Sequence, residues 1–234
     1  MRNLYVFPGV FLSLKALAIT LLLILFAGVV FALRPDFDLS AAGWFFREGR
    51  FFGSGSGERM LRRFFYYAPL VVLLVITLLW LLPKAGVRVP APLVPTSRSM
   101  VFLYGALLAG PWLLVNVVLK EHSNRPRPNQ IIEHSGKSEF RPWYRFDGAC
   151  QTNCSFVSGE VSTSAWLAAP ASLLPPPWNV PAIAGAIAFA AATGALRMAF
   201  GGHFLSDVIF AILFTLLVCQ LMHRLIMRGR RPQG

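Results

Sequence analysis

Six stretches of this chain stay apolar for about as long as a helix needs to cross the ~30 Å hydrocarbon core of a membrane. They run roughly over residues 11–33, 68–82, 101–119, 162–174, 180–196 and 204–227. Because a backbone in lipid must satisfy its own hydrogen bonds, such stretches are expected to be helices. The sequence therefore predicts an all-α fold, a polytopic membrane helical bundle with six transmembrane helices. No cleavage-site pattern follows the first stretch, so we expect it to be retained as a span.

The composition agrees with a membrane protein. Hydrophobic residues make up 56% of the 234 residues and charged residues only 14%, which is more apolar surface than a soluble domain of this length could bury. The net charge of +12 would suggest nucleic acid in a soluble protein, but the cations are scattered over both sides of the bundle. We therefore expect no nucleic-acid partner, and attribute the charge to loop bias, anionic lipid or a phosphorylated substrate. No linker or repeat divides the chain, so one domain is expected over residues 1–234.

The distribution of cations predicts the orientation. An even number of spans places both termini on one side, where nine cations and no acidic residue fall: Arg2, Lys15, Lys84, Arg88, Arg98, Arg224, Arg228, Arg230 and Arg231. The other side holds the remaining 13 of the 22 cations and all ten acidic residues. Lys and Arg favour the cytoplasmic side, so the termini are expected to be cytoplasmic and the acid-bearing loops to face outward. In a Gram-negative-like envelope this corresponds to the inner membrane, with the outer loops in the periplasm.

Two cysteines fall in an outer loop. Cys150 and Cys154 would lie in an oxidising compartment, which permits a disulfide between them. Two unlinked thiols, or two ligands of a zinc ion, are the alternatives. Cys219 falls inside the sixth span and is most simply a small core residue. No metal-ligand cluster is apparent in the sequence.

Three polar clusters, distant in sequence, fall at span ends on the outer side. In the first, Lys120 leaves the third span and is followed by Arg125 and Arg127, with Pro126 and Pro128 stopping the helix. An ammonium and a planar guanidinium held by a stiff turn suit a phosphate group. The alternative is a basic flank whose side chains snorkel to the membrane surface.

The second cluster, "VSGE", precedes the fourth span. Ser158 and Gly159 are expected at a helix N-terminus, where free N–H groups and the helix dipole favour an anion. Gly159 would let the backbone approach that anion closely. An ordinary helix N-cap followed by an acidic residue would look the same.

The third cluster joins the fifth and sixth spans. If the sixth helix begins near His203, then His203 and Asp207 share a face one turn apart. A carboxylate in that place can keep one imidazole nitrogen protonated and leave the other free to attack or to take a proton. Arg197 closes the preceding span on the same side. The alternative is an interfacial histidine with satisfied hydrogen bonds.

These clusters resemble the three signatures of the type 2 phosphatidic acid phosphatase (PAP2) superfamily. Lys120, six residues and then Arg127-Pro128 is similar to the first signature, and Arg197, five residues, His203, three residues and Asp207 is similar to the third. Ser158-Gly159 matches the middle of the second, which is usually Pro-Ser-Gly-His. The resemblance covers residues 101–218, about half of the chain. It implies a six-helix membrane phosphatase with its site at one surface, acting without a metal or cofactor.

The resemblance also implies roles for the residues. His203 would attack phosphorus to form a phosphohistidine, with Asp207 orienting it. The phosphoryl oxygens would be held by a set of cations and backbone groups: Lys120, Arg127, Arg197, Ser158 and Gly159.

The chain departs from the family pattern at three positions. Val157 replaces the usual Pro, Leu196 the usual Ser, and Glu160 the His that protonates the leaving oxygen. Our hypothesis is that Glu160 acts as the general acid. This role requires a pKa raised toward neutrality, which burial would favour and the surrounding cations would oppose.

The expected substrate is a membrane lipid phosphate reached from the outer leaflet. Long outer loops, at 34–67 and 120–161, leave room for a bulky headgroup and favour lipid A, with undecaprenyl diphosphate and phosphatidylglycerol phosphate as alternatives. The aromatic segment 43–52 either lies in the interface beside the site or simply anchors a loop. Because the second-signature His is missing, a non-catalytic lipid-phosphate binder or transporter is the rival interpretation.

Overall fold

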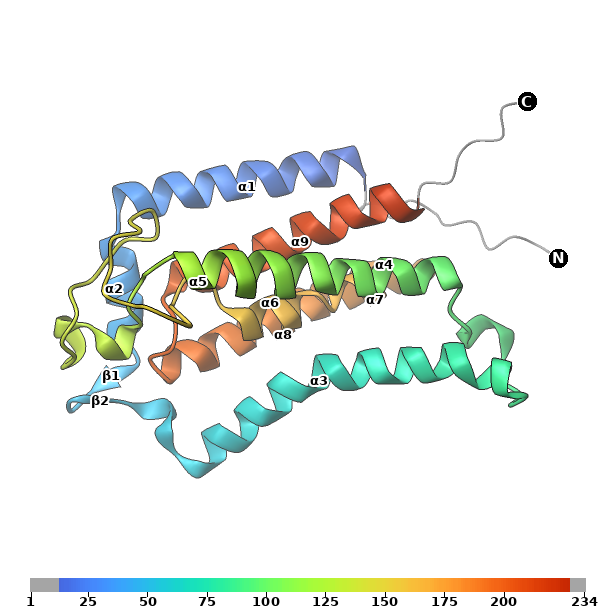
Figure 1. Cartoon of the computed structure of the whole chain (residues 1–234), viewed down its shortest axis with the longest axis horizontal. Coiled ribbons are helices and arrows are strands. Elements are labelled where there is room, and N and C mark those ends of the chain that lie inside the picture. Colours follow the sequence, from blue (N-terminus) through green and yellow to red (C-terminus); the bar gives the residue numbers. More distant parts are fainter. Residues whose placement is uncertain (1–12, 228–234) are drawn as a thin grey trace.

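The computed structural model describes residues 13–227, and five long helical segments lie along one axis in it (Figure 1). They are α1 (Leu14–Leu33); α3 (Ser56–Leu81), extended by η3 (Leu82–Ala85); α4 (Ser97–Leu107), extended by η5 (Leu108–Leu119) and α5 (Lys120–His122); α8 (Asn179–Ala199); and α9 (Leu205–Met227). Each is long and apolar enough to cross a membrane. The protein is therefore mostly helical and a multi-pass membrane protein.

The fourth expected span is a broken element. It consists of α6 (Gly159–Ala165) and α7 (Ala168–Ser172), which are seven and five residues long. Pro170 explains the break, because a proline ring clashes with the carbonyl four residues earlier, and that carbonyl belongs to Trp166, the residue that follows α6. Residues 159–172 would span about 21 Å as a continuous helix, short of the hydrocarbon core. The expected count of six transmembrane helices is not confirmed.

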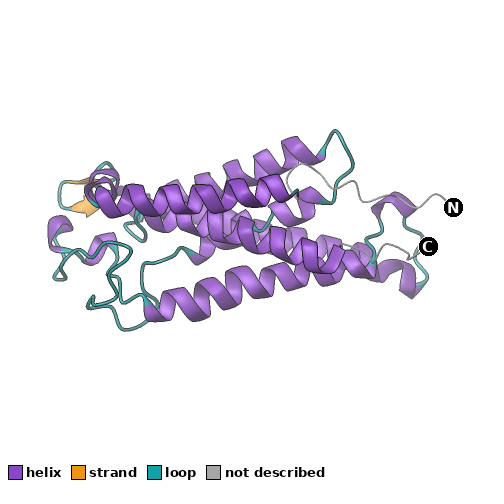
Figure 2. Ribbon diagram, turned by 90° about the horizontal axis from the view of Figure 1, so that it is seen from above, coloured by secondary structure: helices purple, strands orange, loops and turns teal. Residues whose placement is uncertain are grey.

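Short elements and loops gather at one end of the bundle, which we call the site end. They include α2 (Asp36–Gly43), the hairpin of β1 (Phe46–Arg47) and β2 (Arg50–Phe51), η2 (Phe52–Ser54), η6 (Pro128–Gln130) and η7 (Ile132–His134). The hairpin, which pairs Phe46 with Phe51, lies among the loops of that end (Figure 2). The expected aromatic segment 43–52 is thus largely this hairpin. η4 (Ala91–Leu93) lies in the connection at the opposite end.

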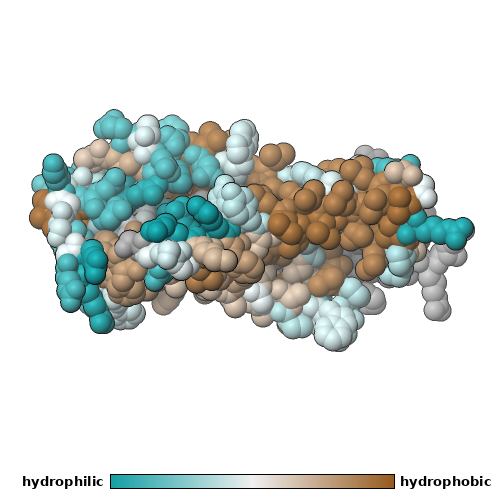
Figure 3. Space-filling model, turned by 90° about the horizontal axis from the view of Figure 1, so that it is seen from below, coloured by the Kyte–Doolittle hydropathy of each residue, from teal (hydrophilic) through white to brown (hydrophobic). Residues whose placement is uncertain are grey.

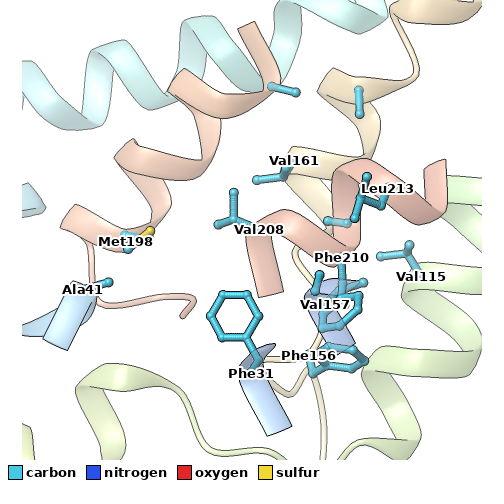
Figure 4. Packing of buried hydrophobic residues seen from close by; sticks show 14 residues of the cluster. Phe31, Ala41, Val115, Phe156, Val157, Val161, Met198, Val208, Phe210 and Leu213 are labelled. Atoms are coloured by element: carbon cyan, nitrogen blue, oxygen red, sulfur yellow. The ribbon is translucent and has the colours of Figure 1, made fainter. Parts of the chain in front are cut away.

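Helix α9 is the centre of the bundle. In the most hydrophobic stretch of each helix, 50% of the residues are buried in α9, compared with 17% in α1 and 6% in α3. Its Phe210 packs against Phe31 of α1 and Phe156, while Val115 of η5 and Val161 of α6 belong to the same cluster (Figure 4). The outward side chains of α1 and α3 are largely apolar and exposed, as expected of lipid-facing helices. In Figure 3, hydrophobic residues cover one half of the visible face and hydrophilic residues gather toward the other end.

Candidate active site

His203 lies in the tight turn between α8 and α9, not on the first turn of α9 as expected. Gly201 opens this turn with a φ of +62°, a conformation that glycine adopts without strain. The imidazole is buried, with Nδ1 lying 2.7 Å from the carbonyl oxygen of Ser155 and 3.7 Å from Asp207 Oδ2. A carbonyl only accepts, so Nδ1 donates to it and Nε2 keeps its lone pair. The carbonyl of Ser155 is an orienting partner that the sequence did not reveal.

Asp207 is fixed by three donors from three parts of the chain. Its Oδ2 accepts hydrogen bonds from the Ser155 hydroxyl at 2.5 Å and from the Phe204 backbone N–H at 2.8 Å. Its Oδ1 accepts from Arg125 Nη1 at 2.5 Å. These hydrogen bonds fix the orientation of the Asp207 carboxylate beside Nδ1 of His203.

Arg125, the member of the first cluster to which the sequence assigned no role, points into the protein interior. Its side chain is fully buried and donates to Asp38 Oδ2 at 2.7 Å, to the Ser206 hydroxyl at 2.8 Å and to the carbonyl of Arg141 at 2.8 Å, in addition to Asp207. Asp38, on α2, also accepts from the backbone N–H and hydroxyl of Ser206. We call Asp38, Arg125 and Asp207 the buried ion triad. No motif marked Asp38 in the sequence, because it lies in a segment read only as an outer loop.

Glu160, in the first turn of α6, is held by two arginines from other helices. Arg62 of α3 donates from Nη2 to Oε1 at 2.5 Å and from Nε to both carboxylate oxygens at 3.1 and 3.2 Å. Arg197, in the last turn of α8, has its Nε 3.6 Å from Oε1. Arg62 was not among the expected site residues, since neither its spacing nor its surroundings in the sequence mark it.

The two cations of the first signature lie at the same end. Arg127 donates from Nε and Nη2 to the carbonyl of Asn153, at 3.2 and 2.7 Å, which fixes the direction of its guanidinium. Lys120, in the last helical turn before the proline-stiffened loop, lies within electrostatic reach of Arg127, Arg197 and Glu160. The structure thus brings together the residues of the three clusters.

Polar groups at the N-terminus of α6 lie beside these cations. The buried Ser158 hydroxyl and the Arg197 Nε have no hydrogen-bond partner within residues 13–227. A Cβ on Gly159 would lie 2.6 Å from Asn116 Oδ1, so only glycine lets α6 approach η5 this closely. Unpartnered donors beside several cations suit an anion such as a phosphoryl group.

The protonation states follow from burial and charge. Burial lowers the pKa of His203 to about 4, with Arg197 acting in the same direction and Asp207 opposing, so the imidazole is neutral at pH 7. Burial raises the pKa of Glu160, but the hydrogen bonds from Arg62 and the charge of Arg197 outweigh it and hold the pKa below its ordinary value. In this arrangement Glu160 is a carboxylate at neutral pH, without the proton that a general acid must donate.

Cys150 and Cys154 form a disulfide, with their Cα atoms 5.7 Å apart. The backbone N–H of Cys154 donates to the carbonyl of Lys120, and the next residue, Ser155, donates to the carbonyl of Arg125. The disulfide loop therefore joins the segment that supplies His203 with its orienting carbonyl. Within residues 13–227, no group of three or more His, Cys, Asp or Glu is arranged to hold a metal ion.

Residues 99–231 match the family model described as the PAP2 superfamily. The chain belongs to this superfamily. Three relatives are lipid A 4'-phosphatases. Those of Rhizobium etli and Rhizobium leguminosarum are each 35% identical over 190 residues, covering 81% of this chain and 73% and 81% of the relatives. That of Francisella tularensis subsp. novicida is 32% identical over 206 residues, covering 85% of this chain and 92% of the relative. No solved structure matches the chain.

Membership of the PAP2 superfamily makes the protein a phosphatase, a phosphoric ester hydrolase on a helical membrane fold. Two of the site residues described above precede the matched segment. Asp38 completes the buried ion triad, and Arg62 pairs with the glutamate that occupies the usual histidine position. This PAP2 site therefore draws charged groups from both parts of the chain.

Proposed function

We propose that the protein removes a phosphate group from lipid A at the outer face of the membrane, through a phosphohistidine on His203. The observation that carries the proposal is the neutral, buried His203, whose Nδ1 is engaged and whose Nε2 remains available beside the cations. The proposed substrate is that of the three relatives, which are lipid A 4'-phosphatases and align with most of this chain. We expect the long loops at the site end to accommodate a large headgroup.

The reaction has two steps. Nε2 of His203 forms a bond to phosphorus while the bond from phosphorus to the lipid oxygen breaks, and that oxygen takes up a proton. Water then attacks the phosphohistidine and releases inorganic phosphate. Lys120, Arg127 and Arg197, with Ser158 and Gly159 at the start of α6, would hold the phosphoryl oxygens, where donors fixed in advance stabilise the developing charge. Asp207 would stabilise the charged imidazole ring.

The proposed topology has six passes in one domain. The start of α1 and the end of α9 lie at the end of the bundle opposite His203, as an even number of passes requires, and the α6–α7 element makes the incomplete fourth pass (Figure 1). Five cations assigned to the cytoplasmic side lie at that opposite end: Lys15, Lys84, Arg88, Arg98 and Arg224. Arg2, Arg228, Arg230 and Arg231 lie outside the described residues. We propose cytoplasmic termini, an inner-membrane location and a site facing the periplasm.

A phosphate-release screen tests the proposal. Detergent-solubilised protein is offered lipid A, undecaprenyl diphosphate and phosphatidylglycerol phosphate, and mass spectrometry of the lipid shows which phosphate has left. We expect lipid A to lose its 4'-phosphate fastest. Faster phosphate release from either of the other two lipids would identify that lipid as the substrate in place of lipid A. Binding of these lipids without phosphate release would favour the non-catalytic binder or transporter.

A further inference from the structure

A carboxylate inside a phosphate site raises a physical problem. Glu160 is only 14% exposed and lies against Arg62 and Arg197, and Arg197 is one of the cations proposed above to hold the phosphate dianion. Two anions so close repel each other strongly in a poorly hydrated site. The nearby cations offset part of this repulsion, and protonation of Glu160 on phosphate binding would remove the rest.

Arg62 is the group able to respond to the phosphate. Its side chain is 41% exposed, it comes from α3, and its guanidinium lies over the ring of Phe200, three residues before His203. A guanidinium offers five donors, and Glu160 engages only the Nε and Nη2 groups of Arg62. Arg62 can therefore turn toward a second anion without leaving the site.

We propose that Arg62 is a phosphate-binding residue that exchanges partners, holding Glu160 before the substrate binds and then the substrate phosphate, so that Glu160 gains a proton and donates it to the leaving oxygen. This inference rests on the proposed phosphatase function and adds to it. The charged and titratable groups that face Glu160 are Arg62 from α3, Arg197 from α8, Lys120 from α5, Arg127 from the following loop and His203 from the turn before α9. When Arg62 turns to the phosphate, the strongest of the interactions that keep Glu160 ionised is lost.

The proton balance closes over one turnover. Glu160 takes one proton from solvent as the phosphate dianion binds, and gives it to the lipid oxygen as the phosphorus–oxygen bond breaks and the nitrogen–phosphorus bond forms. The carboxylate then accepts a proton from the water that attacks the phosphohistidine. The products are hydrogen phosphate and neutral His203, and the last proton returns to solvent when Glu160 pairs again with Arg62.

Binding of tungstate, measured by isothermal titration calorimetry on the detergent-solubilised full chain, tests the inference without turnover. Tungstate, kept dilute enough to remain monomeric, is a tetrahedral dianion that does not itself take up protons between pH 6 and pH 7.5. If the wild type takes up one proton when tungstate binds, its Kd should rise about tenfold for each unit by which the pH is raised. In Glu160→Gln this slope should vanish. An unchanged slope in Glu160→Gln would overturn the inference.

A double variant separates phosphate binding by Arg62 from simple support of Glu160. Glu160→Gln combined with Arg62→Gln should bind tungstate roughly 10- to 100-fold more weakly than Glu160→Gln alone, the expected effect of losing a charge-assisted contact. Because both charges are removed together, neither is left unpaired to disturb folding. Arg63→Gln, which removes the neighbouring exposed cation of α3, is the matched control and should leave the Kd unchanged. If the double variant binds as Glu160→Gln does, Arg62 only supports Glu160 and the inference fails.

Leaving-group dependence tests the proton transfer. Glu160→Gln should lose roughly 10²–10⁴-fold in turnover of the lipid substrate, but at least an order of magnitude less with p-nitrophenyl phosphate, whose leaving group needs no proton. An equal loss with both would mean that Glu160 donates no proton. Failure of the wild type to bind tungstate at all would instead count against the proposed function itself.

Discussion

Replacement of Asp38 by asparagine would weaken the buried ion triad without changing its shape. The two carboxylate oxygens accept from the Ser206 backbone N–H at 2.8 Å, the Ser206 hydroxyl at 2.7 Å and Arg125 Nη2 at 2.7 Å. Asparagine keeps one acceptor oxygen and places an NH₂ group at the other position, so at least one buried donor faces another donor. An unsatisfied buried donor costs about 1–3 kcal/mol, and the bond to Arg125 loses its charge assistance, worth roughly another 1 kcal/mol.

Removal of a buried anion also relieves a desolvation cost, so we expect a net loss of about 2–3 kcal/mol in the free energy of unfolding. Turnover should fall roughly 10- to 100-fold with little change in KM, because Arg125 positions Asp207 and Asp38 has no place in the phosphate site. Thermal unfolding followed by tryptophan fluorescence, together with phosphate release, measures both effects. Asp36→Asn on the same helix is the control, since Asp36 pairs with Arg34 at an exposed position and should change neither quantity measurably. If Asp38→Asn is no more harmful than Asp36→Asn, our account of the triad is wrong.

Three further predictions concern the turn and the loop of the site. His203→Ala should fold but lose nearly all turnover, while the wild type should yield an acid-labile, base-stable phosphoprotein; appreciable turnover by the variant would exclude the phosphohistidine. Because burial depresses the folded-state pKa of His203 from 6.5 to about 4, its contribution to stability is present above pH 6.5 and lost as the pH falls toward 4. Acid unfolding of the wild type should therefore lose a component in that window that is missing in His203→Ala, and identical pH profiles would refute it. Non-reduced peptide mapping should find Cys150 bonded to Cys154 in protein exported through an oxidising envelope, and two free thiols would refute the pairing.

The sequence predicted those parts of the structure that depend on the length of apolar runs or on the fixed spacing of motif residues. Apolar runs of membrane length predicted the five long helices, because the bilayer imposes their length. Four lie near their expected positions, whereas α3 begins at Ser56, well before the expected start at residue 68, because its first turns are polar and charged. The fourth run, 162–174, is short and interrupted by prolines in the sequence, and the structure divides it into α6 and α7 at Trp166, so its count as a full transmembrane helix is not confirmed. The three signature clusters do meet at one end of the bundle, because each follows or precedes a helix that reaches that end.

The partners of the site residues could not be predicted in the same way. Arg125 stands between two cations in the sequence, and only tertiary packing turns it inward to Asp38 rather than outward with Arg127. The protonation of Glu160 depended on whether burial or nearby cations prevail, and the deciding cation, Arg62, is 98 residues away along the chain. Ion pairs of this kind leave no periodicity or spacing to read.

The two ion pairs that cross residue 99 have a consequence for how this enzyme can vary or be recombined. Asp38 and Arg62 belong to the less recognisable first part of the chain, yet each balances a charge carried by the second part. A chimera that joins the PAP2 segment to the first hundred residues of another relative would replace Asp38 and Arg62, the residues that pair with Arg125 and Glu160, by residues from a different site. Compatible exchange between such enzymes must therefore transfer each charge together with its complement, and the smallest interchangeable unit is larger than the segment by which the family is recognised.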